Sequence, residues 1–195
     1  MSFYIHIQET PNPHAVKFIS RYTVRTEGKS NYHNRDEAQS NPLAQRIFDV
    51  GGVVQVFFFD NYITVTKDPT VEWTGLAEEI VDLLQEQLPD HNPNYVDERE
   101  EAKVSREDLP PEIREIEEVL DRTIRPALAA DGGGLEVVER RDGVVYIRYQ
   151  GACGSCPSSV GGTLIAIQSI LRDEIDRDLE VVDVGGGAGA GGGWW

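Results

Sequence analysis

The chain has 195 residues, of which 39% are hydrophobic and 27% are charged, and its formal net charge is −16. This length suits one large domain or two small ones, and the hydrophobic fraction is sufficient for folded cores. The negative charge repels phosphate backbones and argues against nucleic-acid binding. No apolar run reaches the roughly 18 residues of a membrane helix, and residues 1–7 lack a secretory or organelle targeting pattern. We therefore expect a cytoplasmic protein without membrane association.

The first half of the chain predicts a small α+β unit with the order ββαββα. Pro42 suits the first turn of a helix, and the polar residues 26–41 are expected to be mostly loop. The consecutive Phe57, Phe58 and Phe59 cannot all face one side of a strand, which leaves one face for the core and another for a partner. Strands are expected over residues 3–8, 15–24, 53–59 and 62–67, and helices over 42–49 and 73–88.

A polar and acidic stretch separates the two halves of the chain. Residues 89–111 are dominated by Asp, Glu, Pro and Asn, which predicts a linker. The second half predicts another small α+β unit with the order αββαβ. Its helices are expected over 112–130 and 157–173, and its strands over 135–140, 144–150 and 179–184. The fold class is therefore α+β, with small domains at 1–88 and 112–184, an acidic linker at 89–111 and a flexible Gly-rich tail at 185–195.

Short motifs mark the boundaries of elements in the second half. Pro126 is expected to interrupt the helix over 112–130, and the Asp-Gly pair at 142–143 suits a hairpin turn with positive φ. The Asp-Gly-Gly-Gly run at 131–134 predicts the end of that helix and the entry into a strand, or alternatively a loop beside the cysteines. The tail ends in two tryptophans, which either contact a partner or have no defined role.

Cys153 and Cys156 are the only cysteines in the chain, and they lie where a strand is expected to end and a helix to begin. The free N–H groups and the positive dipole at a helix start favour the thiolate, which is the form that binds metal. Two thiolates supply only half of the four ligands that common iron–sulfur clusters use. The pair therefore either acts alone in redox chemistry or requires a second chain to complete a metal site.

Three interpretations of the cysteine pair remain open on these grounds. The first is a redox-active dithiol, which is disfavoured because a thioredoxin-like pair follows a strand in a βαβ framework, whereas an antiparallel hairpin is expected before these cysteines. The second is a zinc ion held by four cysteines from two chains. The third is an iron–sulfur cluster shared between two chains, which the small neighbouring residues would accommodate.

The sequence around the cysteines resembles a known family. Residues 128–137 (LAADGGGLEV) and 151–159 (GACGSCPSS) are similar to the NFU-type domain, the C-terminal domain of NifU-like iron–sulfur cluster carriers. This resemblance covers about residues 112–184. The first half resembles the N-terminal domain that accompanies it in some NFU proteins, through residues 10–18 (TPNPHAVKF), 41–44 (NPLA) and 62–67 (YITVTK).

The resemblance implies a carrier, and not an enzyme, that accepts an assembled [4Fe-4S] cluster and passes it to other proteins. It implies that Cys153 and Cys156 from each of two subunits hold the cluster, so that a homodimer forms on cluster binding. The implied partners are an upstream cluster-assembly scaffold and apo client proteins, and no catalytic residue is expected. A thiol–disulfide oxidoreductase stays the alternative function. The four histidines show no ligand spacing and are expected to have surface or turn roles. His14, in the Pro-rich turn, is the one to test for client contact.

Overall fold

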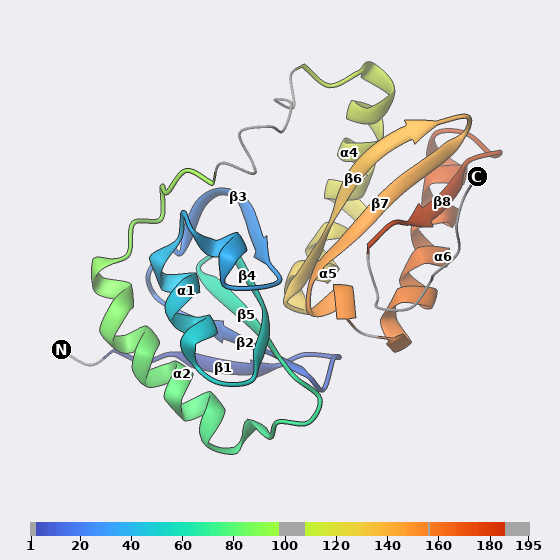
Figure 1. Cartoon of the computed structure of the whole chain (residues 1–195). Coiled ribbons are helices and arrows are strands. Elements are labelled where there is room, and N and C mark those ends of the chain that lie inside the picture. Colours follow the sequence, from blue (N-terminus) through green and yellow to red (C-terminus); the bar gives the residue numbers. More distant parts are fainter. Residues whose placement is uncertain (1–2, 98–107, 156, 186–195) are drawn as a thin grey trace. The chain divides into compact units, whose positions relative to one another are not determined.

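The structure, a computed structural model, describes residues 3–97, 108–155 and 157–185 (Figure 1). The chain divides into two compact units, Met1–Ser105 and Arg106–Trp195. This division falls within the stretch that the sequence predicts to be a linker. Within the described ranges, no helix is long and apolar enough to cross a bilayer.

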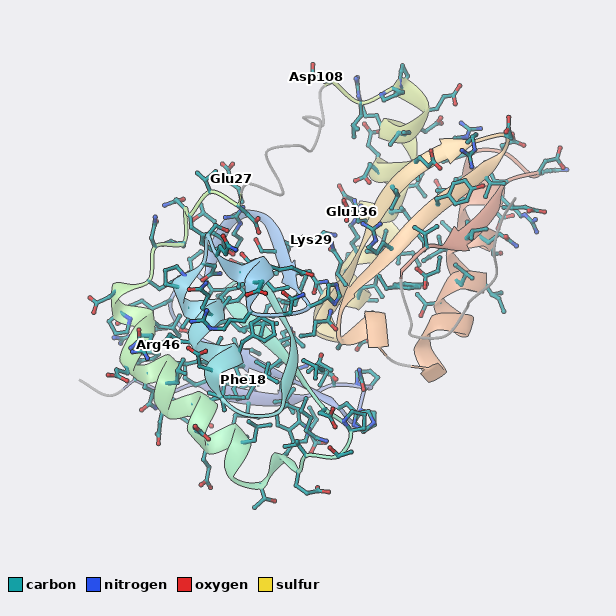
Figure 2. All side chains as sticks on the ribbon, viewed as in Figure 1. Phe18, Glu27, Lys29, Arg46, Asp108 and Glu136 are labelled. Carbon is teal, nitrogen blue, oxygen red and sulfur yellow. The ribbon has the colours of Figure 1, made fainter. Side chains whose placement is uncertain are left out.

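The first unit is an antiparallel sheet with helices on one face. Its helices α1 and α2 both pack on the same side of the sheet, where Phe18, labelled in Figure 2, lies in the core (Figures 1 and 2). The strands run in the spatial order β1-β2-β5-β4-β3. The elements are β1 (His6–Glu9), β2 (Ala15–Ile19), β3 (Arg25–Tyr32), η1 (Asp36–Ala38), α1 (Pro42–Asp49), β4 (Val53–Asp60), β5 (Tyr62–Lys67), α2 (Trp73–Gln87) and η2 (Leu88–Asp90).

The alternation of side chains along β4 confirms that the three phenylalanines are divided between two faces. Phe58 packs in the core with Val56 and Ile63. Phe57 and Phe59 lie on the opposite face, with their ring centroids 6.5 Å apart and their planes nearly parallel. Successive residues of a strand must alternate in this way. The further expectation, that the second face meets a partner, stays a prediction.

The expectation of a loop over residues 26–41 is wrong for its first part. β3 occupies Arg25–Tyr32 and pairs with β4 at the edge of the sheet. Its sequence, RTEGKSNY, has no run of alternating hydrophobic residues, and the register of pairing shifts within it, as at a β-bulge. This edge strand is therefore defined by its backbone pairing, and the order of the first unit is βββαββα.

The polar segment that follows α2 is anchored to the first unit. Tyr95 is buried, and its carbonyl oxygen accepts a hydrogen bond from the Arg25 guanidinium. The His91 Nε2 atom lies 2.8 Å from the carbonyl oxygen of Val24. Residues 91–97 therefore pack as part of the first unit, although they fall within the expected linker. Residues 98–107 of that linker lie outside the described residues.

The second unit is a three-stranded sheet whose helices cover one face. β6 and β7 are antiparallel, whereas β7 and β8 are parallel and are connected through α6. Residues from all three strands and from α4, α5 and α6 form one hydrophobic core cluster (Figure 1). The elements are α4 (Pro111–Thr123), α5 (Arg125–Ala130), β6 (Gly133–Arg141), β7 (Val144–Gly151), η4 (Ala152–Ser155), α6 (Pro157–Glu174) and β8 (Glu180–Asp183).

The helix expected over 112–130 is two helices that separate at Ile124. Pro126 lies in the first turn of α5, where its missing N–H has no intrahelical partner to lose. The side chain of Arg125 joins the two helices, because its guanidinium donates to the Glu117 carboxylate at 2.7 and 3.0 Å and to Asp121 at 2.6 Å. The interruption predicted from Pro126 is confirmed, and it takes the form of a break before the proline.

The fold class is confirmed as α+β in two small domains. The second unit has the predicted order αββαβ when α4 and α5 are counted as one helix. The turn between β6 and β7 also agrees with the prediction, because Asp142 and Gly143 have φ values of 52° and 78°. The tail from residue 186 onward lies outside the described residues.

Candidate functional site

Cys153 lies at the predicted junction between a strand and a helix. It belongs to η4, which connects the end of β7 to the start of α6. Its side chain is 6% exposed and packs in the core cluster of the second unit with Ile147 and Tyr149. Cys156 and the side chains of residues 155–160 lie outside the described part of the chain. The structure therefore gives the surroundings of one member of the predicted pair.

Gly133, at the start of β6, lies directly against Cys153. A Cβ atom added to Gly133 would be 2.5 Å from the Cys153 Sγ, 2.7 Å from the Gln150 carbonyl oxygen and 2.9 Å from the Cys153 amide nitrogen. Cβ atoms do not approach other heavy atoms within 3.0 Å, so only glycine fits at this position without a shift. The preceding residue, Gly132, has a φ of 78°, and its carbonyl oxygen accepts a hydrogen bond from the Ala152 amide at 3.2 Å.

The two interpretations of residues 131–134 therefore both hold. Gly132 ends α5 through a hydrogen bond from its amide to the Ala129 carbonyl oxygen, as expected for a glycine helix stop. The same short segment then passes beside η4 and allows β6 to approach the cysteine. The sequence pattern indicated the first role, whereas the close approach depends on the pairing of β6 with β7.

Tyr149 is a buried polar neighbour of Cys153 that the sequence analysis did not identify. It lies on β7 with its side chain 4% exposed, and its hydroxyl has no hydrogen-bond partner within the described ranges. Burial, followed by the charges of Asp183 and Cys153, raises the pKa of the Tyr149 phenol. The phenol therefore stays protonated and can donate a hydrogen bond to a thiolate or a sulfide. The alternation of Val145, Ile147 and Tyr149 along β7 was the available sequence signal that this side chain points into the core.

Gln150 lies on the opposite face of β7 from Tyr149. Its side chain is buried, and its Nε2 donates to a carboxylate oxygen of Glu136 at 3.3 Å. Glu136, labelled in Figure 2, projects from β6, so this bond joins the two strands immediately before the cysteine loop. The Gln150 side-chain oxygen has no partner among the residues that the structure describes. The end of β7 thus carries unsatisfied polar atoms on both faces.

His14, the histidine to test for client contact, lies in the turn before β2 of the first unit. Its amide donates to the Asn12 side-chain oxygen at 3.0 Å, and its carbonyl oxygen accepts from the Lys67 amide at 2.8 Å. The Trp73 indole N–H donates to the Pro13 carbonyl oxygen at 3.1 Å. The turn therefore connects β2, β5 and α2, which is a structural role, and client contact at His14 stays a prediction.

The chemistry that this arrangement can perform is that of a soft thiolate ligand. Cys153 is the described residue with a ligand atom suited to iron or zinc at this junction. Over the described ranges, no group of three or more His, Cys, Asp or Glu side chains is arranged to hold a metal ion. Cys153 lies against Gly133 with apolar neighbours, and its thiolate is a ligand for a soft metal.

The fold and the site together define a class of protein. This class has two small α+β units, and the second unit carries its cysteine motif between a strand and a long helix. Residues 5–91 match the family described as "Scaffold protein Nfu/NifU N terminal", and residues 116–182 match the "NifU-like domain". The chain therefore belongs to the NFU family of NifU-like proteins, with the N-terminal Nfu domain present.

Relatives of the chain include proteins from a plant and an insect. The chain is 34% identical over 181 residues to "NifU-like protein 5, mitochondrial" of Arabidopsis thaliana, with 90% of this chain and 66% of that protein covered. It is 32% identical over 197 residues to "NFU1 iron-sulfur cluster scaffold homolog, mitochondrial" of Drosophila persimilis, with 93% and 66% covered. The chain thus spans about two thirds of the length of these relatives.

Solved structures of single domains are also similar to parts of the chain. A solution structure of a NifU-like protein from Saccharomyces cerevisiae has 34% sequence identity and a TM-score of 0.43, and the match covers 46% of this chain and 81% of that one. A crystal structure of a Staphylococcus aureus protein has 23% identity and a TM-score of 0.38, and covers 42% and 99%.

The expectation of a cytoplasmic location is wrong in the light of these relatives. Their names describe them as mitochondrial, which points to mitochondria and not to the cytoplasm. The expectation rested on residues 1–7, in which no targeting pattern was recognised, and on the lack of an apolar run of membrane length.

Proposed function

We propose that this chain carries an iron–sulfur cluster as cargo, holds a [4Fe-4S] cluster between two copies of itself, and transfers it to apo client proteins. One observation carries the proposal, namely a single cysteine pair at the junction of β7 and α6 in a member of the NFU family. Cys153 and Cys156 of each copy would supply four thiolates, the number that common four-iron clusters use. An upstream cluster-assembly scaffold would supply the cargo.

The surroundings of Cys153 support a ligand role. Gly133 lies directly against the sulfur on one side, and apolar core residues limit the access of water from that side. The Tyr149 hydroxyl is a donor within this core, and hydrogen bonds to sulfur are one of the means by which proteins tune a cluster. The relative from Drosophila persimilis is named an iron–sulfur cluster scaffold, which supports the same class of function.

Transfer would proceed by ligand exchange. Each incoming client thiolate forms a bond to a cluster iron as one carrier thiolate leaves, so the number of ligands and the charge of the cluster are conserved at each step. Because each copy of the chain contributes two ligands, two exchanges on one side release that copy. Only iron–thiolate bonds are exchanged and the cargo itself is left chemically unchanged, and we therefore propose that the protein is not an enzyme.

The test is anaerobic reconstitution with iron and sulfide, followed by iron and sulfide analysis and by measurement of the mass in solution. We expect about one four-iron cluster per two chains, in a dimer that returns to the monomer when the cluster is removed. Cys153→Ala and Cys156→Ala should each abolish cluster uptake. Asp178→Asn, in an exposed turn of the same unit, is the matched control and should bind as the unaltered chain does. A complete cluster in a monomer would refute the proposal.

One observation keeps the thiol–disulfide oxidoreductase as a second candidate. β7, α6 and β8 form a parallel βαβ unit, and the cysteine motif lies between its first strand and its helix. The antiparallel hairpin expected before the cysteines is present, but its second strand also begins this βαβ unit, which weakens the sequence argument against this candidate. A catalytic disulfide reductase activity that survives iron removal, together with no uptake of iron by the unaltered chain, would favour the oxidoreductase over the carrier.

A further inference from the structure

α6 has an uncharged face that points away from the core of the second unit. Ile167 and Leu171 are buried in the core, and Leu164 packs against it. Ile165 lies on the other side of the helix and is 71% exposed. The residues around it on this side are also exposed, and all are small: Gly161, Gly162, Ala166 and Ser169. We refer to these five residues as the α6 face.

The charge pattern distinguishes the α6 face from an ordinary helix surface. Residues 149–171 contain no Asp, Glu, Lys or Arg, although 27% of the chain is charged. Helices of soluble proteins normally place charged and polar side chains on the side that faces water. A single exposed isoleucine is common on its own. An exposed isoleucine within a long uncharged stretch instead matches the centre of protein interfaces, from which charged residues are depleted.

We propose that the α6 face is the surface on which a second copy of this chain packs when the cluster is shared. This inference rests on the proposed function, because one chain has two cysteines and the cluster site is incomplete without another copy. The face begins at Gly161, the fifth residue of α6, which directly follows the cysteine loop. At a rise of 1.5 Å per residue this is about 6 Å from the start of the helix. A copy that brings its own cysteines to the same cluster must therefore lie beside this part of α6.

The shape of the α6 face suits packing against an identical face. A Cβ atom placed on Gly161 or Gly162 would have no neighbour within 4 Å, so the space above both residues is open to a partner's side chain. Small residues allow two helices to approach closely. In a two-fold arrangement the same patch meets itself, so that Ile165 of each copy would pack on the glycines of the other.

The size of the α6 face explains why pairing would depend on the cluster. It offers one large apolar side chain per copy, whereas stable dimers usually bury about 1,200 Å² or more. Contact through this face alone would thus be weak, and the shared metal–thiolate bonds would supply the remaining free energy of dimerisation. Binding of the cargo and pairing of the copies would then be one event, and loss of the cargo would separate the copies.

Two matched substitutions test this inference in the full chain. Ile165→Lys adds a charge to the centre of the α6 face, and Val138→Lys adds the same charge to an exposed valine, 42% accessible, on β6 of the same unit. Lysine is a good helix former, so Ile165→Lys should leave the unfolding midpoint of the apo chain unchanged. After anaerobic loading with iron and sulfide, the loaded dimer is titrated by dilution and followed by its mass in solution.

We expect Ile165→Lys to raise the dimer dissociation constant at least tenfold. The increase should be about a hundredfold if Ile165 of each copy contributes the full free energy of its burial to the dimer. Val138→Lys should dissociate as the unaltered chain does. Equal dissociation constants for the unaltered chain and Ile165→Lys would refute the α6 face while leaving the proposed function intact. If Ile165→Lys transferred the cluster less well to an apo recipient while its dimer dissociation constant stayed unchanged, the α6 face would be a client-binding surface, and the inference would also be overturned. Failure of the unaltered chain to form a loaded dimer would overturn both proposals.

Discussion

Replacement of Gly133 by alanine is the most direct test of how the cysteine loop is held. The new Cβ would lie 2.5 Å from the Cys153 Sγ and 2.7 Å from the Gln150 carbonyl oxygen, whereas real Cβ contacts exceed 3.0 Å. The sulfur must therefore move by at least 0.5 Å, the difference between 3.0 and 2.5 Å, and the Gln150 backbone by at least 0.3 Å. The sulfur could move by rotation of its side chain, but the Gln150 oxygen and the Cys153 nitrogen are backbone atoms of the loop.

The loss of stability expected for Gly133→Ala follows from the free-energy cost of overpacking. An extra methyl group in a packed site destabilises by about 1–3 kcal/mol. For a unit of this size, each kcal/mol lowers the melting temperature by roughly 4–8 °C. Gly161→Ala is the matched control, because the same methyl group enters open space on a helix. Since alanine is the better helix former, the control should gain about 0.5–1 kcal/mol.

The assay is urea unfolding of the full apo chain under reducing conditions. Hydrogen exchange of the β6 and β7 amides separates the unfolding of the second unit from that of the first. Loading with iron and sulfide then shows whether the displaced Cys153 still serves as a ligand, and we expect Gly133→Ala to retain less iron per chain. If Gly133→Ala were stabilised as Gly161→Ala is, the close contact of β6 with the cysteine loop would be absent and the reasoning would fail.

Three other substitutions test buried polar groups. Tyr149→Phe removes a hydroxyl without a partner in the described ranges, so urea unfolding of the apo chain should show no loss, or a gain of about 1 kcal/mol. Because burial raises the Tyr149 pKa, the linked stability is present below about pH 10 and lost above it, and Tyr149→Phe should reduce that alkaline loss. Arg125→Met leaves the carboxylates of Glu117 and Asp121 without their guanidinium and should cost about 3 kcal/mol in urea unfolding at pH 7. Burial lowers the His91 pKa, so thermal unfolding should show a loss of stability as the pH falls below about 6.5, and His91→Gln should lack this loss.

The elements that the sequence predicted well are those with apolar periodicity or a strong turn signal. β5 has the predicted bounds, and α6 begins at the predicted Pro157. The turn at 142–143 has the positive φ values that its Asp-Gly pair indicated. In each case a local pattern was sufficient, because the neighbours in sequence are also the neighbours that decide the conformation.

The features that the sequence did not predict depend on contacts between distant segments. β3 has a polar sequence, and its strand structure comes from pairing with β4. Residues 91–97 read as linker because of their Asn and Asp content, but Tyr95 anchors them in the first unit. The parallel pairing of β8 with β7 likewise has no local signature.

The same limit applies to the site. Cys153 was placed correctly at the end of a strand, because its neighbours in sequence define that boundary. Gly133 was recognised as part of a helix stop or, alternatively, of a loop beside the cysteines, and not as a strand residue in contact with the sulfur. Its close approach to the sulfur of Cys153 depends on the register of β6 against β7, in which Gly133 is opposite Gly151. Tyr149 was counted only as a strand residue, and its unsatisfied hydroxyl is visible only when the whole core is assembled.

The charge of the chain yields a last prediction for the loaded dimer. Each copy carries a formal net charge of −16, so pairing brings like charges together and is opposed by repulsion. The uncharged residues 149–171 keep charge away from the cysteine loop and the α6 face, but not from the rest of the unit. Salt screens charges beyond about 8–10 Å at physiological ionic strength. Raising the salt concentration from 20 to 200 mM should therefore tighten the loaded dimer by about two- to tenfold, measured by dilution as before. A dimer that weakens with salt would show that ion pairs hold the two copies together, which an uncharged contact face does not allow.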